Sequence, residues 1–129
     1  MEEGSADLEL GTRTEGRATV VVVRGEIDLS TVPQLSDQLD ELINEDHVDL
    51  IIDMGGVGFI DSTGLGALVG ARKKALAKDG SVQLACVQQK ILKVFRITQL
   101  TELFPVHDSV ADALTSSSDR PSDPERTLS

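Results

Sequence analysis

The sequence of 129 residues contains no tryptophan, no tyrosine and only three phenylalanines. Single-stranded nucleic acids and cationic ligands are bound largely on aromatic rings, so those binding modes have few side chains to use here. Positive charge is also scarce, because 12 lysines and arginines stand against 22 aspartates and glutamates, which gives a formal net charge of -10. A nucleic-acid interface requires a clustered basic face. Neither DNA nor RNA is therefore an expected partner.

Cysteine and long apolar runs are scarce as well. Cys86 is the single cysteine, so no internal disulfide can form, and this suits a reducing compartment. Its place in the alternating stretch SVQLACV indicates a small core residue rather than a reactive thiol. The first ten residues lack the positive and apolar regions of a signal peptide, and no apolar run approaches the roughly 20 residues that span a bilayer. We expect a cytoplasmic protein without a membrane partner.

The charges are unevenly distributed along the chain. Residues 1–71 hold 15 acids and three bases, whereas residues 72–96 hold seven bases and one acid. Four of those bases, Arg72, Lys73, Lys74 and Lys78, fall in one predicted helix. They form either the solvated side of that helix or a surface that steers a partner, and the sequence leaves both interpretations open.

Apolar periodicity and turn residues predict a single α/β domain. A hairpin is expected from residues 7–14 and 18–25 around Gly16, followed by a helix at 30–46 capped by Ser30 or Thr31. The apolar stripe of this helix consists of Leu35, Leu39, Leu42 and Ile43. The other expected strands are 47–54, 81–87 and 103–107, and the other expected helices are 62–80, 88–100 and 109–115.

The predicted order is therefore ββαβαβαβα, a mixed sheet of about five strands with right-handed crossover helices. The domain is expected at residues 5–115. The polar tail 116–129 is expected to be disordered, because it is too poor in apolar residues to offset its ordering entropy. GGVG at 55–58 is predicted to be a loop. The crossovers bring EIDLS (26–30) and GGVGFIDSTG (55–64) to the carboxyl ends of adjoining strands, where α/β proteins present functional loops.

The segment FIDSTGLG at 59–66 offers a serine at the start of a helix, and a serine hydrolase is the first function to consider. That function requires a Gly-x-Ser-x-Gly elbow together with histidine and acidic partners. Ile60 stands where the first glycine of the elbow belongs. His47 and His107 lie at strand ends, in positions more typical of surface residues than of a base. The sequence therefore disfavours Ser62 as a nucleophile and indicates no enzyme activity.

Two phosphate-based alternatives also fit poorly. The helix start is surrounded by glycines at 55, 56, 58, 64 and 66. However, Asp61 stands where the third glycine of a nucleotide-binding motif belongs, and an acid there repels phosphate. A receiver-like phosphoaspartate at Asp53 would need an acidic pair after the first strand to hold a divalent metal, whereas Glu26 and Asp28 flank an apolar residue. The sequence therefore predicts no cofactor and no metal.

Two roles for Ser62 stay open on the local pattern. As a plain helix N-cap it would explain DST before an apolar helix without any function, and the local pattern favours this role. As a residue presented for phosphorylation it would profit from the free amides and the positive dipole of the first helical turn. The phosphate adds about -1.5 to -2 charges, which would expel a partner that docks over a hydroxyl.

Three segments together resemble an anti-sigma factor antagonist, the small bacterial form of the STAS domain (sulfate transporter and anti-sigma factor antagonist). They are GEID at 25–28, LIIDM with GVGFIDSTGLGALV at 50–54 and 56–69, and ILKVFRITQLTELFPVHDSVADAL at 91–114. The resemblance covers roughly residues 5–115. It implies a protein that is not an enzyme and that binds an anti-sigma factor, itself a serine kinase of the GHKL ATPase type, and thereby frees a sigma factor.

The resemblance also implies the site. The kinase would phosphorylate Ser62 and so release the antagonist, and a metal-dependent serine phosphatase would restore it. Asp28, Asp61 and Ser62 would belong to the partner-binding surface. The remaining residues expected there are Thr63, Gly64, Leu65 and Gly66. As a loop acid, Asp28 is expected to be exposed and to matter more for binding than for stability. The alternative is a STAS module that binds a small ligand or a nucleotide at the same helix start.

Overall fold

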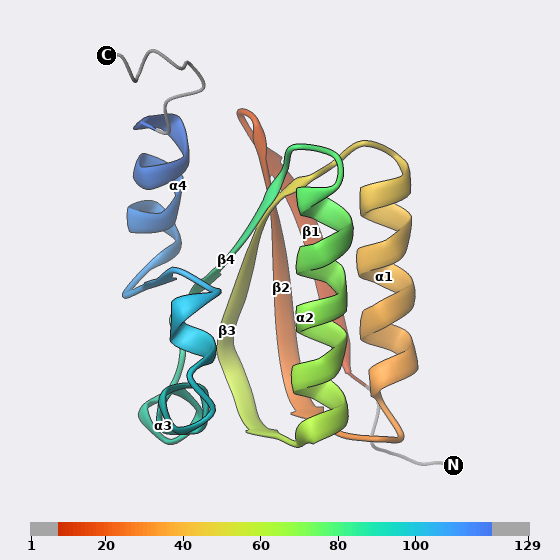
Figure 1. Cartoon of the computed structure of the whole chain (residues 1–129), viewed down its shortest axis with the longest axis vertical. Helices are drawn as coiled ribbons and strands as arrows, with labels where there is room; N and C mark the ends of the chain where they lie inside the picture. Colours follow the sequence, from red (N-terminus) through yellow and green to blue (C-terminus); the bar gives the residue numbers. More distant parts are fainter. Residues whose placement is uncertain (1–7, 120–129) are drawn as a thin grey trace.

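A five-stranded mixed sheet forms the centre of the structure, a computed structural model that describes residues 8–119 (Figure 1). The strands lie side by side in chain order, with β1 antiparallel to β2 and all other neighbours parallel. The strands are β1 (Glu9–Glu15), β2 (Ala18–Ile27), β3 (Asp49–Ile60), β4 (Ser81–Ala85) and β5 (Val106–His107). The helices are α1 (Val32–Asn44), α2 (Ser62–Leu76), α3 (Gln89–Ile97) and α4 (Val110–Asp119), with a 3-10 helix, η1, at Leu100–Glu102. The predicted ββαβαβαβα order is confirmed.

The opening hairpin forms where the sequence predicts it. Gly16 occupies the turn with φ of 62°, a left-handed conformation that glycine adopts without strain. Glu15 pairs with Ala18 across that turn, and the pairing continues to Glu9 and Arg24. The hairpin therefore places residue 9 beside the carboxyl end of β2.

Strand β3 is longer than predicted. The segment 55–58, expected to be a loop, is part of the strand, which pairs with β2 as far as Ile60. The pairing of β2 with β3 shifts register between Val22 and Arg24 and again between Gly25 and Glu26, as at β-bulges. A Cβ at Gly56 would lie 2.6 Å from Cγ of Arg24, so glycine is what allows the two strands to stay close here. The loop prediction was wrong because these glycines fit the chain against a neighbouring strand and do not break the strand.

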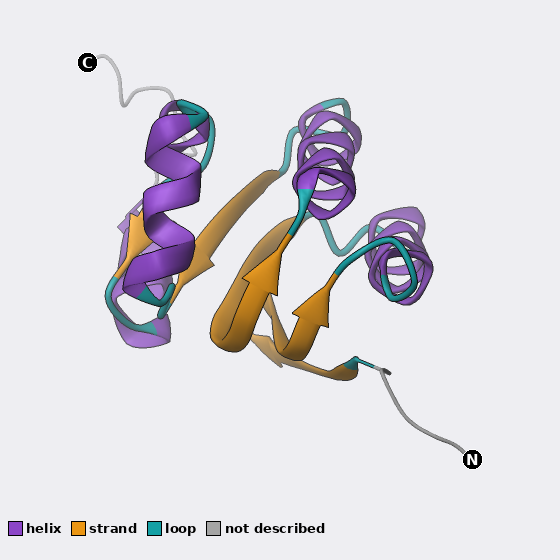
Figure 2. Ribbon diagram, turned by 90° about the horizontal axis from the view of Figure 1, so that it is seen from below, coloured by secondary structure: helices purple, strands orange, loops and turns teal. Residues whose placement is uncertain are grey.

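The sheet is covered on both faces, as Figure 2 shows end-on. Alternate residues of β2 and β3 point to opposite sides: Val21 and Ile52 join the larger core, whereas Val20 and Ile51 join the smaller one. The larger core is completed by α1, α2 and α3, and the smaller one by α4 through Ala113. A strand buried on both faces reads as a continuous apolar run, which is why LIIDM was recognisable in the sequence.

The predicted stripe of α1 is confirmed, because all four of its apolar residues are buried. Helix α2 packs through smaller residues. Leu68 is buried, but Leu76 is 45% exposed, and the small residues Ala71 and Ala75 face the sheet in its place. Small residues bring α2 close to the strands, and this fixes the position of the first turn of the helix.

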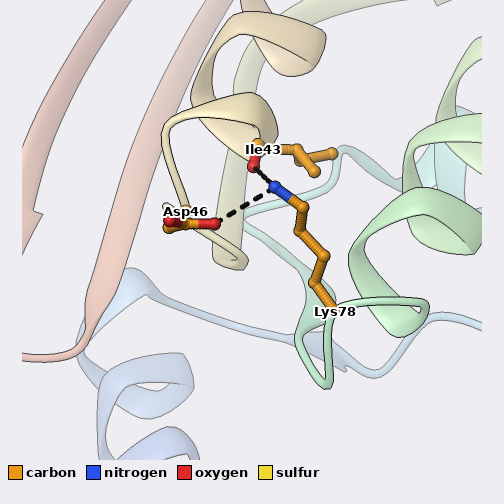
Figure 3. A network of polar contacts seen from close by, with 3 residues as sticks. All are labelled: Ile43, Asp46 and Lys78. Carbon is orange, nitrogen blue, oxygen red and sulfur yellow. Dashed lines mark hydrogen bonds and ion pairs between the residues drawn. The ribbon is translucent and has the colours of Figure 1, made fainter.

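The basic residues of this region mainly contact the protein itself. Lys78 donates to the carbonyl of Ile43 (2.9 Å) and to Oδ1 of Asp46 (3.1 Å), so it neutralises the carboxyl end of α1 (Figure 3). Lys74 donates to Asp40 at 2.8 Å, and Nε of Arg72 donates to the carbonyl of Leu103 at 3.0 Å. These contacts favour a structural role over a partner-steering one. Lys73 makes no such contact with the described residues and is exposed.

The carboxyl-terminal boundary falls inside a helix. Helix α4 runs to Asp119, so residues 116–119 of the predicted tail are helical. Residues 120–129 lie outside the described part of the chain, as do residues 1–7. The domain limits of 5 and 115 therefore stay a prediction.

Candidate functional site

The two predicted loops meet at the carboxyl edge of the sheet. The amide of Asp61 donates to the carbonyl of Ile27 at 3.1 Å, directly beyond the pairing of Ile27 with Ile60. The turn after β2 and the start of α2 therefore adjoin. This arrangement places Asp28 and the FIDSTGLG residues on one edge, as the right-handed crossover predicted. We call this surface, made of residues 28–31 and 59–66, the switch edge.

Asp61, not Ser62, is the N-cap of α2. Its backbone is extended (φ -108°, ψ -174°), and its Oδ1 accepts from the amide of Gly64 at 3.1 Å. The same oxygen accepts a hydrogen bond from the Thr63 hydroxyl. The backbone carbonyl of Asp61 accepts from the amide of Leu65 at 3.0 Å. The local interpretation of Ser62 as a plain cap was wrong, because the residue before it already has an oxygen that can reach the third amide of the helix.

Ser62 is consequently left without a structural task. It is the first residue of α2 and is exposed. No hydrogen bond of its hydroxyl is found among residues 8–119, in contrast to the hydroxyl of its neighbour Thr63. The first amides of a helix point outward along its axis and carry the positive end of the dipole. Ser62 thus presents a free hydroxyl at the positive end of the helix dipole, directly after the carboxylate of Asp61.

Asp28 organises the turn beside it. Its Oδ1 accepts from the amide of Ser30 (3.0 Å), the hydroxyl of Ser30 (2.8 Å) and the amide of Thr31 (3.2 Å). The buried hydroxyl of Thr31 accepts from the amide of Asp28 (2.9 Å) and donates to the carbonyl of Glu26 (2.7 Å). Asp28 is half-buried, so the expectation of a simply exposed acid was wrong. The turn is locked by these reciprocal bonds, and Asp28 contributes to its conformation.

The glycines of FIDSTGLG differ in what they do. Gly64 is buried, and a Cβ there would lie 2.5 Å from Cγ2 of Ile27 and 2.7 Å from Cγ1 of Ile60. Gly66 is exposed, and a Cβ there would meet nothing within 4 Å. Gly64 is therefore required by packing inside the chain. Nothing inside the described chain requires Gly66, although glycine costs a helix up to about 1 kcal/mol relative to alanine.

Both acids of the switch edge are held in the ionised form. Hydrogen bonds from the Ser30 side chain, and then from nearby amides, lower the pKa of Asp28 from its ordinary 3.8, although burial acts in the opposite direction. The Thr63 hydroxyl, followed by the Gly64 amide, lowers the pKa of Asp61 in the same way. The backbone amide of Leu29 also lowers the pKa of Asp61, as the weakest of these influences.

The lowered pKa of Asp61 predicts how stability depends on pH. A carboxyl whose pKa is lower in the folded state stabilises the fold fully above its unfolded value, here near 3.8, and loses that contribution as the pH falls through the folded value. We expect Asp61→Asn to unfold at a lower temperature than the wild type at pH 7, and the difference to shrink below about pH 4. Thermal unfolding between pH 7 and 3 measures this. A constant difference across that range would show that the charge of Asp61 is irrelevant.

Other candidates from the sequence do not join this site. Nδ1 of His47 lies 3.4 Å from the Thr19 hydroxyl, before the start of β3, and Nε2 of His107 lies 2.6 Å from Oε1 of Gln83. Asp53 accepts from the amide of Gly55 at 2.9 Å. Burial raises the pKa of the Cys86 thiol, followed by the negative charge of Asp53, which disfavours a thiolate. The glycines at 55, 56 and 58 lie in a strand, so they form no loop around a phosphate.

Two further negative findings apply to the described part of the chain. Within residues 8–119, no group of three or more His, Cys, Asp or Glu side chains is arranged to hold a metal ion. No helix in this part of the chain combines the length and the apolar character needed to cross a bilayer.

Sequence reasoning missed two residues of the switch edge. Thr31 was considered only as a helix cap, yet its side chain makes no cap bond and instead closes the turn. The other is Leu29, which is 73% exposed at the tip of that turn. A large apolar residue between Asp28 and Ser30 is the signal that could have been noticed, because turns are usually polar.

Comparison with known proteins gives the family and the fold of this chain. Residues 9–113 match the family model of the STAS domain. A curated relative, the anti-sigma-B factor antagonist of Staphylococcus aureus, is 32% identical over 102 residues, which cover 79% of this chain and 94% of the relative. The crystal structure of an anti-sigma factor antagonist from Mycobacterium paratuberculosis is 28% identical, with a TM-score of 0.80, and the match covers 87% of this chain and 95% of that one.

More distant structures share the fold in both chemical states. SpoIIAA, an anti-sigma factor antagonist solved in its unphosphorylated form, is 20% identical with a TM-score of 0.68 over 86% of this chain and 99% of that one. The phosphorylated form of SpoIIAA from Bacillus gives 21% identity and a TM-score of 0.67 over 85% and 98% of the two chains. The family match over residues 9–113 and the relative at 32% identity together show that this chain belongs to the STAS family, as an anti-sigma factor antagonist.

Proposed function

We propose that this antagonist binds its anti-sigma factor through the switch edge while Ser62 is unphosphorylated, and that phosphorylation of Ser62 releases it. The observation that carries the proposal is that Asp61, and not Ser62, caps the start of α2. Asp61 caps the helix and holds Thr63, so the Ser62 hydroxyl is exposed and has no described partner. A residue with no structural task can be modified without loss of the fold.

The anti-sigma factor is proposed to be a serine kinase of the GHKL ATPase type, which acts on the antagonist that it binds. The kinase would transfer the γ-phosphoryl group of ATP to Oγ of Ser62, with ADP as the leaving group and the hydroxyl proton lost to a base of the kinase. A metal-dependent serine phosphatase would hydrolyse the ester and restore the hydroxyl. Because these partners control transcription, we place the antagonist in the cytoplasm.

The electrostatics of the switch edge explain how one phosphate can act as a switch. Asp28 and Asp61 are already ionised there, and phosphate adds about -1.5 to -2 charges beside them. The helix dipole stabilises an anion at this position by about 0.3–1 kcal/mol, so the isolated antagonist tolerates the change. Under a docked partner the same dianion loses its hydration water. The free-energy cost of an unpaired buried charge is considerably larger than the stabilisation by the helix dipole.

Gly66 gives independent support for a partner at this place. The chain itself does not require glycine there, yet a helix without a side chain lets another backbone approach closely. Gly66 lies in the first two turns of α2 with Thr63 and the half-buried Leu65. We propose that these two turns lie under the anti-sigma factor.

Phosphorylation mapping tests the modified residue. We expect the purified protein, incubated with ATP and its anti-sigma factor kinase, to gain one phosphate at Ser62, and Ser62→Ala to gain none. Thr63 is the internal control, because its hydroxyl is bonded to Asp61 and should stay unmodified. Peptide mass spectrometry separates the two adjacent positions. Phosphate on Thr63, or on Ser62→Ala at the wild-type rate, would refute Ser62 as the acceptor.

A further inference from the structure

Two of the four large apolar side chains that are exposed in residues 8–119 lie on the switch edge. They are Leu29, 73% exposed, and Phe59, 46% exposed. The other two, Leu76 and Ile97, lie at the carboxyl ends of α2 and α3. Large exposed apolar residues gathered at one place are typical of a binding surface, whereas single scattered ones are not.

The backbone holds Leu29 in a fixed position. Its neighbours Asp28, Ser30 and Thr31 are joined by the hydrogen bonds that close the turn. A leucine at the tip of a turn that is closed in this way loses little backbone freedom when it becomes buried. Preorganised apolar side chains of this kind contribute more to affinity than mobile ones, because less entropy is lost on binding.

The surroundings of Leu29 define the chemistry of what covers it. The segments 26–31 and 59–66 contain three acids and no base, and Asp28 and Asp61, the two acids of the switch edge, are both held ionised. A complementary surface must therefore offer an apolar pocket flanked by lysine or arginine side chains. A second copy of this chain would bring its own acids against these acids, and an anionic lipid surface would be repelled in the same way.

We infer that Leu29 is an apolar anchor of the switch edge, which inserts into a pocket of the anti-sigma factor that is lined by apolar residues and flanked by basic ones. This inference rests on the proposed function, since it specifies the partner of the same surface. It adds a specificity determinant that lies outside the FIDSTGLG segment. Central apolar anchors in desolvated pockets dominate the energetics of protein interfaces, and flanking charges chiefly set the association rate.

The test measures affinity for a defined probe. The anti-sigma factors encoded in the same genome as this chain are purified and tested against the Ser62→Ala variant. The one that binds this variant most tightly is used as the probe. We expect Leu29→Ala to weaken its binding by about 10- to 100-fold, mainly through faster dissociation. Leu29→Met keeps an apolar side chain of similar volume and should bind within about threefold of wild type. Ile97→Ala removes an equally exposed apolar side chain elsewhere, 70% exposed, and should change nothing.

Three outcomes separate this inference from the proposed function. If Leu29→Ala binds as tightly as the wild type while Ser62→Asp binds weakly, the anchor is refuted and the switch stands. If Leu29→Ala and Ile97→Ala weaken binding equally, the loss is not specific to the switch edge and the anchor is again refuted. If no anti-sigma factor binds the Ser62→Ala variant, the proposed function fails and the anchor fails with it. Thermal midpoints of both alanine variants should match the wild type, because neither side chain is in the core.

Discussion

Replacing Ser62 with aspartate is expected to weaken binding to the anti-sigma factor by about 100-fold or more, while Ser62→Ala binds as the wild type does. A 100-fold loss corresponds to about 2.8 kcal/mol, and an unpaired charge desolvated in an interface costs at least that much. Because Ser62 is exposed and its hydroxyl has no partner in the described chain, neither substitution removes an internal contact. The effect should therefore appear in affinity and not in folding.

A third variant separates charge from size. Ser62→Asn has nearly the shape of Ser62→Asp but no charge, so it should bind much closer to wild type than the aspartate does. Isothermal titration or surface plasmon resonance against the same anti-sigma factor measures all three. Similar losses for asparagine and aspartate would mean that the interface excludes bulk and not charge, and the electrostatic account of the switch would then be wrong.

The Gly64→Ala variant is expected to lose up to about 2 kcal/mol of unfolding free energy. Its new methyl group would lie 2.5 Å from Cγ2 of Ile27 and 2.7 Å from Cγ1 of Ile60, and both isoleucines are buried and cannot move aside. Overpacking of this kind costs typically 1–3 kcal/mol, and the better helix propensity of alanine returns only about 1 kcal/mol. The strain would push the first turn of α2 away from the strand ends that position Asp61.

Gly66→Ala is the matched control, two residues further along the same helix. Its methyl group would meet no atom within 4 Å, so the propensity gain should leave the midpoint unchanged or raise it slightly. Urea unfolding monitored by circular dichroism gives both values. Equal stability of the two variants would contradict the close packing of Gly64 between Ile27 and Ile60.

The elements that the sequence predicted well are those governed by long apolar patterns. The stripe of α1 and the doubly buried run at 50–54 are physical consequences of burial, so periodicity reveals them. The path of β3 through Gly55, Gly56 and Gly58 could not be read in the same way. Whether a glycine breaks a strand or lets it approach its neighbour depends on the neighbour, here Arg24, and local sequence does not identify that residue.

In the candidate site, too, some features could be predicted from the sequence and others could not. The meeting of the two loops follows from crossover handedness, and the structure brings Asp28 and Ser62 to one edge as predicted. The choice of Asp61 as the N-cap could not be made from DST alone, because aspartate and serine both cap well. Only the backbone angles and the bond to Gly64 distinguish them. That distinction changes the interpretation of Ser62 from a structural cap to a free hydroxyl.

The central claim is that a phosphate on Ser62 removes the partner and leaves the fold intact. The most direct measurement compares the affinity of one anti-sigma factor for the unphosphorylated protein and for the same protein fully phosphorylated at Ser62, with thermal midpoints recorded on both samples. The account predicts affinities that differ by about 100-fold or more and midpoints that agree within a few degrees. Equal affinities, or a phosphorylated protein that has lost its folded structure, would contradict it.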